Sequence, residues 1–325
     1  MKRRELLTLV GAAAAWPALA RAQQTPAART IGFLHTGSPE ANAKRVASFR
    51  KALNEAGFVD GQNLAIEYRW TSGHNEKLDE MARELVMKRV DAIVTLSATP
   101  AAVAAKRATT TIPIYFLIAE SPVELGLVSS LNRPGGNATG IITLAAELAA
   151  KRFALLRELM PRASTMAMLL KSGNVGAKAV SASVQATART LGVRLEIFEA
   201  NTEQEIDRTY AALKRGIPLM VATDSYFFAR RARIIALSAR HSVPTIYDSR
   251  EFAEAGGLWS YGPNHIRLWH QAGTYVARIL KGQKPGDLPV EQATFFELVV
   301  NQKTAKELGM AIPSTLLLRA DEVIG

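Results

Sequence analysis

Three hydroxyl residues, each followed directly by proline, are the residues of this sequence best suited to holding a small anion. They are Ser38-Pro39, Thr99-Pro100 and Ser121-Pro122, and each comes after a short apolar segment. A serine or threonine before proline is typical of a helix start, because the hydroxyl caps backbone N–H groups and proline fits the first turn. The N-terminus of a helix attracts carboxylates and other small anions. Each site taken alone is also compatible with a purely structural cap.

The second half of the sequence has a corresponding group of polar residues. Thr223 and Asp224 follow the apolar segment 219–222, and Asp248 follows a further apolar segment. Either aspartate could accept a hydrogen bond from a ligand amine or hydroxyl, or could cap the next helix. Tyr226 could stack on a ligand. These side chains are therefore candidates for a second wall of a binding site.

The sequence lacks the local motifs of common catalytic sites. It has no Gly-x-Ser-x-Gly elbow, no His-Glu-x-x-His pair and no phosphate-binding loop. It also has no cysteine, which excludes thiolate zinc ligands and a cysteine nucleophile. We expect no catalytic residue, no metal and no cofactor. An exported hydrolase is the alternative, because catalytic triads are built from distant residues, and Ser97 with His35 is the pair to test.

Short apolar segments alternate with amphipathic ones along the whole chain. In the first half the apolar segments typical of strands are 31–34, 64–70, 92–96 and 112–118. After a turn at 133–137 the pattern begins again, with a helix expected at 151–160 and apolar segments at 165–170, 194–198, 219–222 and 245–247. Such alternation predicts parallel sheets covered by helices, in two similar α/β lobes. Ligands bind beyond the C-terminal ends of the strands in sheets of this kind, where the polar residues above are found.

The first 22 residues have the features of an export signal. A basic start at 2–4 precedes a short apolar stretch at 6–20, and Ala20-Arg21-Ala22 fits a cleavage site. The run Arg3-Arg4-Glu5-Leu6-Leu7 is typical of a twin-arginine signal, with a general secretory signal as the alternative. We therefore expect a periplasmic protein cleaved near Ala22.

Composition narrows the class of protein further. The chain has 325 residues, 48% of them hydrophobic, and a formal net charge of +11, a length that suggests two domains. Its basic residues are scattered, and the densest cluster, Arg230, Arg231 and Arg233, has the spacing of a solvated helix face. Without a basic stripe interleaved with aromatic residues, we expect no binding to nucleic acid. No apolar run reaches the ~20 residues of a membrane-spanning helix.

The sequence resembles the family of ABC-transporter substrate-binding proteins that includes tryptophan- and tyrosine-binding members. Nearly the whole chain after the signal takes part in this resemblance. The segments that carry it are 54–63, 67–70, 121–131, 133–140, 250–252, 255–258, 260–262, 279–282 and 287–290. The combination is specific, although no single segment is.

The resemblance implies a fold like that of type I periplasmic-binding proteins, with two Rossmann-like lobes joined by a three-segment hinge. Such lobes close over a ligand held between them. The implied N-terminal lobe is 29–142 plus 264–296, and the implied C-terminal lobe is 143–263 plus 297–325. The implied hinge crossings lie near 139–143, 261–263 and 296–299.

The resemblance also implies the function and the site. The expected role is the solute-binding component of an ABC importer, which passes a small organic ligand, an aromatic amino acid or a related carboxylate, to a permease in the inner membrane. A ligand-sensing module for a membrane receptor is a further alternative. The ligand-binding residues that the resemblance implies are Thr36, Ser97, Ala98, Thr99, Thr223 and Asp224. The strand-end pattern described above adds Ser121, Tyr226 and Asp248 to the expected site.

One departure from the family pattern bears on the ligand. The family usually has Asp-Pro-Val where this chain has Ser121-Pro122-Val123. A carboxylate at that position could hold a ligand ammonium, whereas the serine hydroxyl carries no charge. A neutral or acidic compound without an amine is therefore a ligand class comparable with amino acids, unless Asp224 supplies the negative charge.

Overall fold

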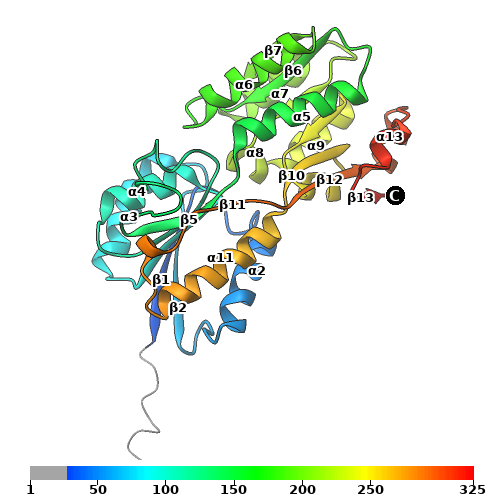
Figure 1. Cartoon of the computed structure of the whole chain (residues 1–325). Coiled ribbons are helices and arrows are strands. Elements are labelled where there is room, and N and C mark those ends of the chain that lie inside the picture. The colour runs from blue at the N-terminus through cyan, green and yellow to red at the C-terminus, as the bar shows by residue number, and fades with distance from the viewer. Residues whose placement is uncertain (1–27) are drawn as a thin grey trace, which may run out of the picture.

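The computed structural model describes residues 28–325, so the export signal expected at 1–22 lies outside the described residues. Two sheets form two lobes, which lie side by side with the chain running back and forth between them (Figure 1). This arrangement confirms the predicted fold class of two α/β lobes.

The sheet of the N-terminal lobe has six parallel strands in the order β11-β5-β4-β3-β1-β2. Its strands are β1 (Arg29–His35), β2 (Leu64–Trp70), β3 (Ala92–Leu96), β4 (Ile114–Ile118), β5 (Ala138–Ile142) and β11 (Glu291–Gln292). Its longer helices are α2 (Ala43–Glu55), α3 (Leu78–Met87), α4 (Thr99–Ala108) and α11 (His265–Leu280). The single turns η1 (Asn75–Lys77) and η2 (Pro285–Asp287) complete this lobe.

The alternation of side chains along the strands decides which helices cover each face of this sheet. Phe33 points into a cluster with Phe49 of α2 and Trp269 of α11. Its neighbour Leu34 points the other way, into a cluster with residues of α3 and α4 such as Leu85. Because successive strand residues face opposite sides, the continuous apolar run of β1 is buried by helices on both faces.

The sheet of the C-terminal lobe has seven strands in the order β13-β12-β10-β9-β8-β6-β7, of which only the pair β10 and β12 is antiparallel. Its strands are β6 (Thr165–Leu170), β7 (Arg194–Glu199), β8 (Leu219–Val221), β9 (Thr245–Tyr247), β10 (Trp259–Pro263), β12 (Phe296–Asn301) and β13 (Glu322–Ile324). Its helices are α5 (Ala145–Leu159), α6 (Ala177–Thr190), α7 (Glu203–Ala212), α8 (Ser225–Ala229), α9 (Arg231–Arg240), α10 (Arg250–Glu254), α12 (Gln302–Glu307) and α13 (Ser314–Leu317).

The chain passes between the two sheets three times. Thr143 and Leu144 join β5 to α5, Asn264 joins β10 to α11, and residues 293–295 join β11 to β12. Three crossings are what a three-segment hinge requires, which confirms this part of the predicted fold.

Two of the three helix starts predicted from Ser/Thr-Pro pairs are wrong. After Ser38 the chain makes a turn, and α2 begins only at Ala43. After Ser121 no helix forms, and the serine hydroxyl accepts a hydrogen bond from Glu124 N at 3.4 Å within a turn. A hydroxyl residue before proline suits turns as well as helix starts, so the dipeptide alone does not separate the two. Only α4 begins at its predicted pair, with Ala98 as N-cap and Pro100 in the first turn.

Other boundaries also differ from the prediction. The resemblance places a hinge crossing near 139–143, whereas residues 138–142 form the buried strand β5. The helix expected from Lys151 begins six residues earlier, at Ala145. Both differences lie next to a crossing between the lobes, where tertiary packing extends elements beyond what the local pattern indicates.

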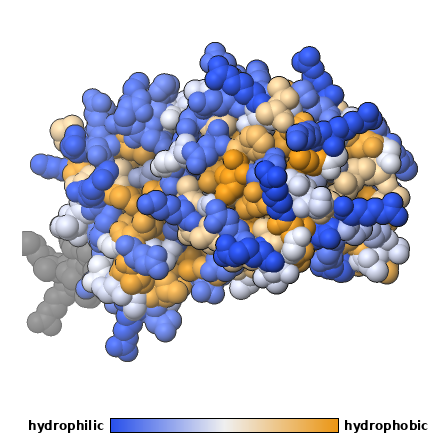
Figure 2. Space-filling model, turned by 90° about the horizontal axis from the view of Figure 1, so that it is seen from above, coloured by the Kyte–Doolittle hydropathy of each residue, from blue (hydrophilic) through white to orange (hydrophobic). Residues whose placement is uncertain are grey.

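The surface is mixed in character. Figure 2 shows one face, on which hydrophobic residues gather near the middle and hydrophilic side chains surround them. None of the helices between residues 28 and 325 is long and apolar enough to cross a membrane.

Candidate functional site

A cavity of about 110 Å³ lies between the two lobes. Its lining comes from the C-terminal ends of β1, β3 and β4 in the N-terminal lobe and of β6 and β8 in the C-terminal lobe. Strand ends meet there because both sheets are parallel at these positions. The two walls touch beside the cavity, where the hydroxyl oxygens of Thr36 and Ser225 lie 2.8 Å apart. The lobes are therefore closed in this structure.

Seven of the nine residues predicted for the site line this cavity. They are Thr36, Ser97, Ala98, Thr99, Thr223, Asp224 and Tyr226. Asp248 instead lines a smaller neighbouring cavity. Ser121 lies outside the lining of both, because the chain has already turned away from the strand end at that residue.

The N-terminus of α4 forms the polar end of the cavity. Ser97 has a positive φ of 53°, an uncommon conformation for a residue other than glycine, and such strained residues cluster at functional sites. The first N–H groups of a helix have no partner within the helix, so Ala98 and Thr99 are placed where an anion is attracted. The cap prediction for the Thr99 side chain is wrong, because its hydroxyl donates instead to Glu120 Oε2 at 2.5 Å.

Glu120 is the cavity residue that the sequence prediction missed. It lies two residues beyond β4 and lines the cavity directly before Ser121. Burial raises the pKa of its carboxyl group, while the hydrogen bond from Thr99 acts in the opposite direction. The sequence did contain a signal for Glu120, because it is a charged residue that follows an apolar segment. It lies one position before Ser121, the residue that was chosen by comparison with the family pattern.

Asp224 has the structural role that the sequence left as one of two alternatives. Its carboxylate caps α8 by accepting a hydrogen bond from Tyr226 N at 2.7 Å. It also accepts one from Asn174 Nδ2 at 2.7 Å. Burial raises the pKa of Asp224, although Tyr226 N and the charge of Lys171 act against this rise. A cap does not exclude ligand contact, because the carboxylate still lines the cavity.

The smaller cavity has a volume of about 40 Å³ and lies beside the larger one, with which it shares Ser97, Thr223, Asp224, Ser225 and His265 in its lining. Asp248 and His35 lie on its wall. Burial raises the pKa of Asp248, and the charges of Arg152 and Arg45 oppose this.

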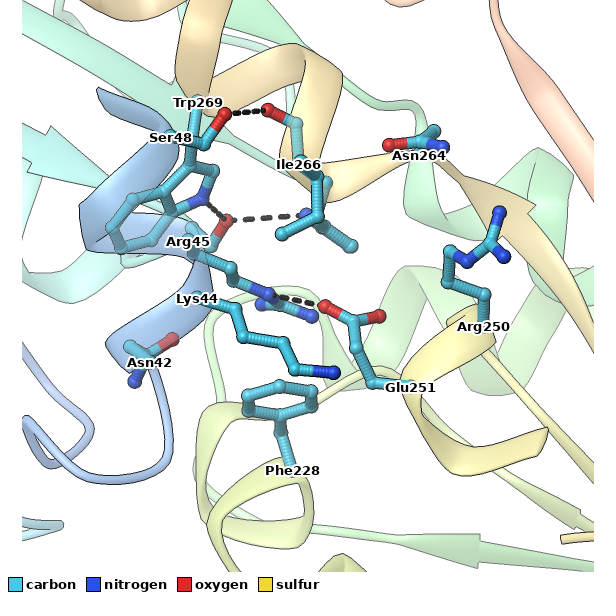
Figure 3. Close-up of polar contacts among 12 residues, drawn as sticks. Asn42, Lys44, Arg45, Ser48, Phe228, Arg250, Glu251, Asn264, Ile266 and Trp269 are labelled. Atoms are coloured by element: carbon cyan, nitrogen blue, oxygen red, sulfur yellow. Dashed lines mark hydrogen bonds and ion pairs between the residues drawn. The ribbon is translucent and has the colours of Figure 1, made fainter. Parts of the chain in front are cut away.

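An ion pair joins the two lobes beside this smaller cavity. Arg45 of α2 donates from Nε to Glu251 Oε1 of α10 at 2.7 Å, and both side chains are at least nine-tenths buried (Figure 3). The Arg45 guanidinium also lies 3.7 Å from the ring centroid of Phe228 in α8. Burial would raise the pKa of Glu251, but the charge of Arg45 and its hydrogen bond act against burial, and the pKa is lowered to about 2. The pair is therefore ionised in the closed form.

The hydrolase alternative gains no support from the geometry. The predicted pair of Ser97 and His35 is not formed, because the Ser97 hydroxyl contacts Trp269 Nε1 at 3.2 Å and His265 Nδ1 at 3.4 Å. Burial, together with the charge of Arg45, lowers the pKa of His265 to about 3. An imidazole with so low a pKa is a poor general base at neutral pH.

No metal site was found within residues 28–325, where no three histidine, aspartate or glutamate side chains are grouped to hold an ion. The walls of the cavity are instead hydroxyl, amide, carboxylate and apolar groups, as in sites that bind small organic molecules.

Comparison with known proteins decides the family. The model of the family described as "ABC transporter substrate binding protein" matches residues 31–324. The chain belongs to this family. Among its relatives is a tyrosine-binding protein of Clostridioides difficile (strain R20291), which is 28% identical over 268 residues, covering 82% of this chain and 77% of that protein.

Two solved structures of this ABC substrate-binding type are informative. A Streptococcus pneumoniae ABC domain in complex with L-Trp has a TM-score of 0.82 at 27% identity, covering 92% of this chain and all of the other. The ligand-free, open structure of a Clostridium difficile substrate-binding protein has a TM-score of 0.65 at 26% identity, covering 91% and 99%. At nearly the same identity and coverage, this chain overlaps more closely with the L-Trp complex than with the ligand-free, open structure.

Proposed function

We propose that this substrate-binding protein is the solute-binding component of an ABC importer. It captures a small organic ligand with a carboxylate, an aromatic amino acid or a close relative, and catalyses no reaction. In this proposal the units 29–142 with 264–296 and 143–263 with 297–325 close as rigid lobes about the three crossings. The observation that carries the proposal is the cavity between two lobes that are in contact beside it.

The cavity has the two kinds of surface that such a ligand needs. The N-terminus of α4 offers N–H groups to a carboxylate. Leu117, Leu170 and Val180 form apolar wall, and Tyr226 adds an aromatic ring. A tyrosine-binding relative and a neighbour with bound L-Trp support an aromatic side chain for the ligand.

Export and delivery complete the proposal. The basic and apolar segments of 1–22 fit an export signal, which would place the protein in the periplasm after cleavage near Ala22. The closed form would then be recognised by a permease in the inner membrane. The family to which the chain belongs supports this partnership.

The test of the function is a thermal-shift screen of residues 23–325 against amino acids, aromatic acids and small organic anions. A ligand at about 100 times its dissociation constant should stabilise the folded protein by roughly 2.7 kcal/mol and raise the melting temperature by several degrees. The compound should be recovered chemically unchanged after incubation. Conversion of the compound would contradict a pure binding role, and the absence of any ligand in both the screen and the material released on denaturation would contradict binding itself.

The two walls of the cavity should each contribute to affinity. Thr99→Ala and Asp224→Ala should each weaken binding of the ligand found in the screen by about 1–3 kcal/mol, because each leaves a buried polar partner unpaired. Isothermal titration calorimetry measures the change, with the exposed Ser130→Ala as control. Unchanged affinity in both variants would show that the ligand binds elsewhere.

A further inference from the structure

A second space between the lobes adjoins the ligand cavity. It is a groove of about 240 Å³, lined from the N-terminal lobe by 36–38 and 72–73 and from the C-terminal lobe by Glu203, Ser225, Tyr226, Ala229 and Arg230. Thr36, Gly73, Ser225 and Tyr226 line both the cavity and the groove. These four residues therefore form the wall that divides the two spaces, and the contact between the Thr36 and Ser225 hydroxyls is part of it.

The order of the strands places this groove at the outer edge of both sheets. In the N-terminal lobe the strands follow one another as β4, β3, β1 and β2, and Gly73 comes after the edge strand β2. In the C-terminal lobe Glu203 begins α7, shortly after the edge strand β7. The N-terminus of α4 follows β3, further from the edge. A ligand with its carboxylate at α4 that extends toward the edge therefore meets the dividing wall.

The ring of Tyr226 is the bulkiest part of this wall. Lys171 lines the cavity but not the groove, and its Nζ lies 5.9 Å from the centroid of the ring. Arg230 lines the groove but not the cavity, and its guanidinium carbon lies 3.6 Å from the same centroid. The ring thus stands between the two spaces, with one cation toward each.

Contacts from both lobes hold the ring in place. Arg230 donates from Nε to Glu203 Oε1 at 2.9 Å, so the arginine that covers the ring is itself fixed. The backbone of Gly73 lies against the ring from the other lobe, because a Cβ added there would be 3.5 Å from Cδ2 of Tyr226. The wall is therefore complete only when the lobes are closed.

Closure around this ring limits the room that a ligand has. A ligand that reaches past Tyr226 must displace the ring from Arg230 or keep the lobes apart. Forcing extra atoms into a packed wall is costly, and loss of the stacked cation adds to that cost. The groove beyond has the hydroxyl groups of Ser38 and Ser72 in its lining, so it could hold an extension of the ligand once the ring is removed.

We propose that Tyr226 determines the size of the ligand. It admits an aromatic acid with a single ring system and excludes the same acid lengthened at its ring. Arg230 acts through Tyr226 as a positioning residue. The inference rests on the proposed function and adds a size limit to the ligand class of that site.

The experiment compares compact and lengthened acids by isothermal titration calorimetry. The pairs are L-tyrosine with O-benzyl-L-tyrosine, L-tryptophan with 5-benzyloxy-L-tryptophan, and 3-(4-hydroxyphenyl)propionate with its benzyl ether. The wild type should bind at least one compact probe and bind its lengthened partner at least about 10-fold more weakly. Tyr226→Ala should bind that lengthened partner more tightly than the wild type does and lose the preference for the compact probe. Such a gain of binding cannot result from poor folding.

Three further variants make the result specific. Tyr226→Phe keeps the ring and should keep the preference for the compact probe. Arg230→Ala leaves the ring without its stacked cation and should reduce the preference in part. Phe58→Ala removes another partly buried ring beneath a cation, Lys281 Nζ at 5.9 Å, which lines neither space, and should leave the preference as in the wild type. Melting curves of the ligand-free proteins confirm that each variant folds, and Tyr226→Leu serves if Tyr226→Ala does not.

The failures can be told apart. A wild type that binds both members of a pair equally, or a folded Tyr226→Ala that still rejects the lengthened probe, would overturn the role of Tyr226 while leaving a binding protein in place. A folded wild type that binds no compact probe would also overturn that role, because the site would then not accept aromatic acids. If such a protein in addition released no small molecule on denaturation, the result would count against the proposed function as well.

Discussion

Arg45→Met should weaken ligand binding by about 3 kcal/mol, or roughly 100-fold, while leaving both lobes folded. The reason is that Arg45 and Glu251 belong to different lobes and form a buried ion pair at 2.7 Å. Removing one partner of a buried ion pair leaves an uncompensated charge and typically costs about 3–5 kcal/mol. In an open form water can solvate Glu251, so this cost applies to the closed form that holds the ligand.

The measurement combines calorimetry with small-angle scattering. Calorimetry gives the affinity of the ligand identified by the screen, and scattering shows whether the ligand still closes the lobes. Arg45→Met should bind weakly and remain more open at a given ligand concentration. The contact of Arg45 with the Phe228 ring, at 3.7 Å, adds a smaller loss in the same direction.

A double variant and a matched control test the cause. Arg45→Met with Glu251→Gln removes both charges and should recover most of the affinity, because no unpaired charge is then buried. Arg50→Met changes an exposed arginine of the same helix, paired with Asp60 at 3.1 Å, and should have little effect. Wild-type affinity in Arg45→Met would mean that the ion pair contributes nothing to closure.

The elements of the fold could be predicted because their signals are local. Strands such as 64–70, 92–96 and 165–170 are short apolar runs, and they form strands with these bounds. The parallel arrangement follows from the helices between them. The wrong predictions concern segments near the crossings between the lobes. The turn after Ser121 and the early start of α5 depend on how the lobes meet, and no short window of the sequence contains that information.

The site shows the same division between local and distant information. Strand ends were predictable, so Ser97, Ala98 and Thr99 lie in the cavity as expected. Glu120 was missed by one residue, because a family pattern indicates a region more reliably than the residue that faces inward. The pair of Arg45 and Glu251 was beyond prediction, since the partners are 206 residues apart and only closure brings them together.

Lowering the pH from 6.5 to 5 should destabilise the protein through two buried histidines. Burial, reinforced by the charge of Arg45, lowers the pKa of both His35 and His265 to about 3. Their pKa in the unfolded chain is about 6.5. Between these values the unfolded chain binds protons that the folded protein cannot, so stability is fully present above pH 6.5 and falls as the pH is lowered. Each histidine should cost about 2 kcal/mol over this interval.

Below pH 5 other buried groups also titrate, and their effects on the stability of the fold have opposite signs. The prediction is therefore limited to the interval from pH 6.5 to 5. The Glu251 carboxyl group has a pKa of about 2 in the folded protein. It stabilises the fold at pH values above its pKa in the unfolded chain, and this contribution is lost only as the pH falls below about 4.5. Burial raises the pKa of Glu120, Asp224 and Asp248, so their protonation favours the folded state and reduces the net loss. We expect the effect of the histidines to prevail between pH 6.5 and 5, because the pKa of each falls to about 3 in the folded protein.

The midpoint of thermal unfolding, measured at several pH values between 6.5 and 5, tests this expectation. It should fall in the wild type and fall about half as steeply in His265→Gln, which leaves only His35 to be protonated on unfolding. His74→Gln changes a histidine whose side chain is 67% exposed and should follow the wild type. Equal slopes in all three proteins would mean that His265 already takes up protons in the folded protein, before either lobe unfolds. Both histidines border the smaller cavity between the lobes. Opening of the lobes would then be the step that lets protons reach the two histidines, and acid should weaken ligand binding before it unfolds either lobe.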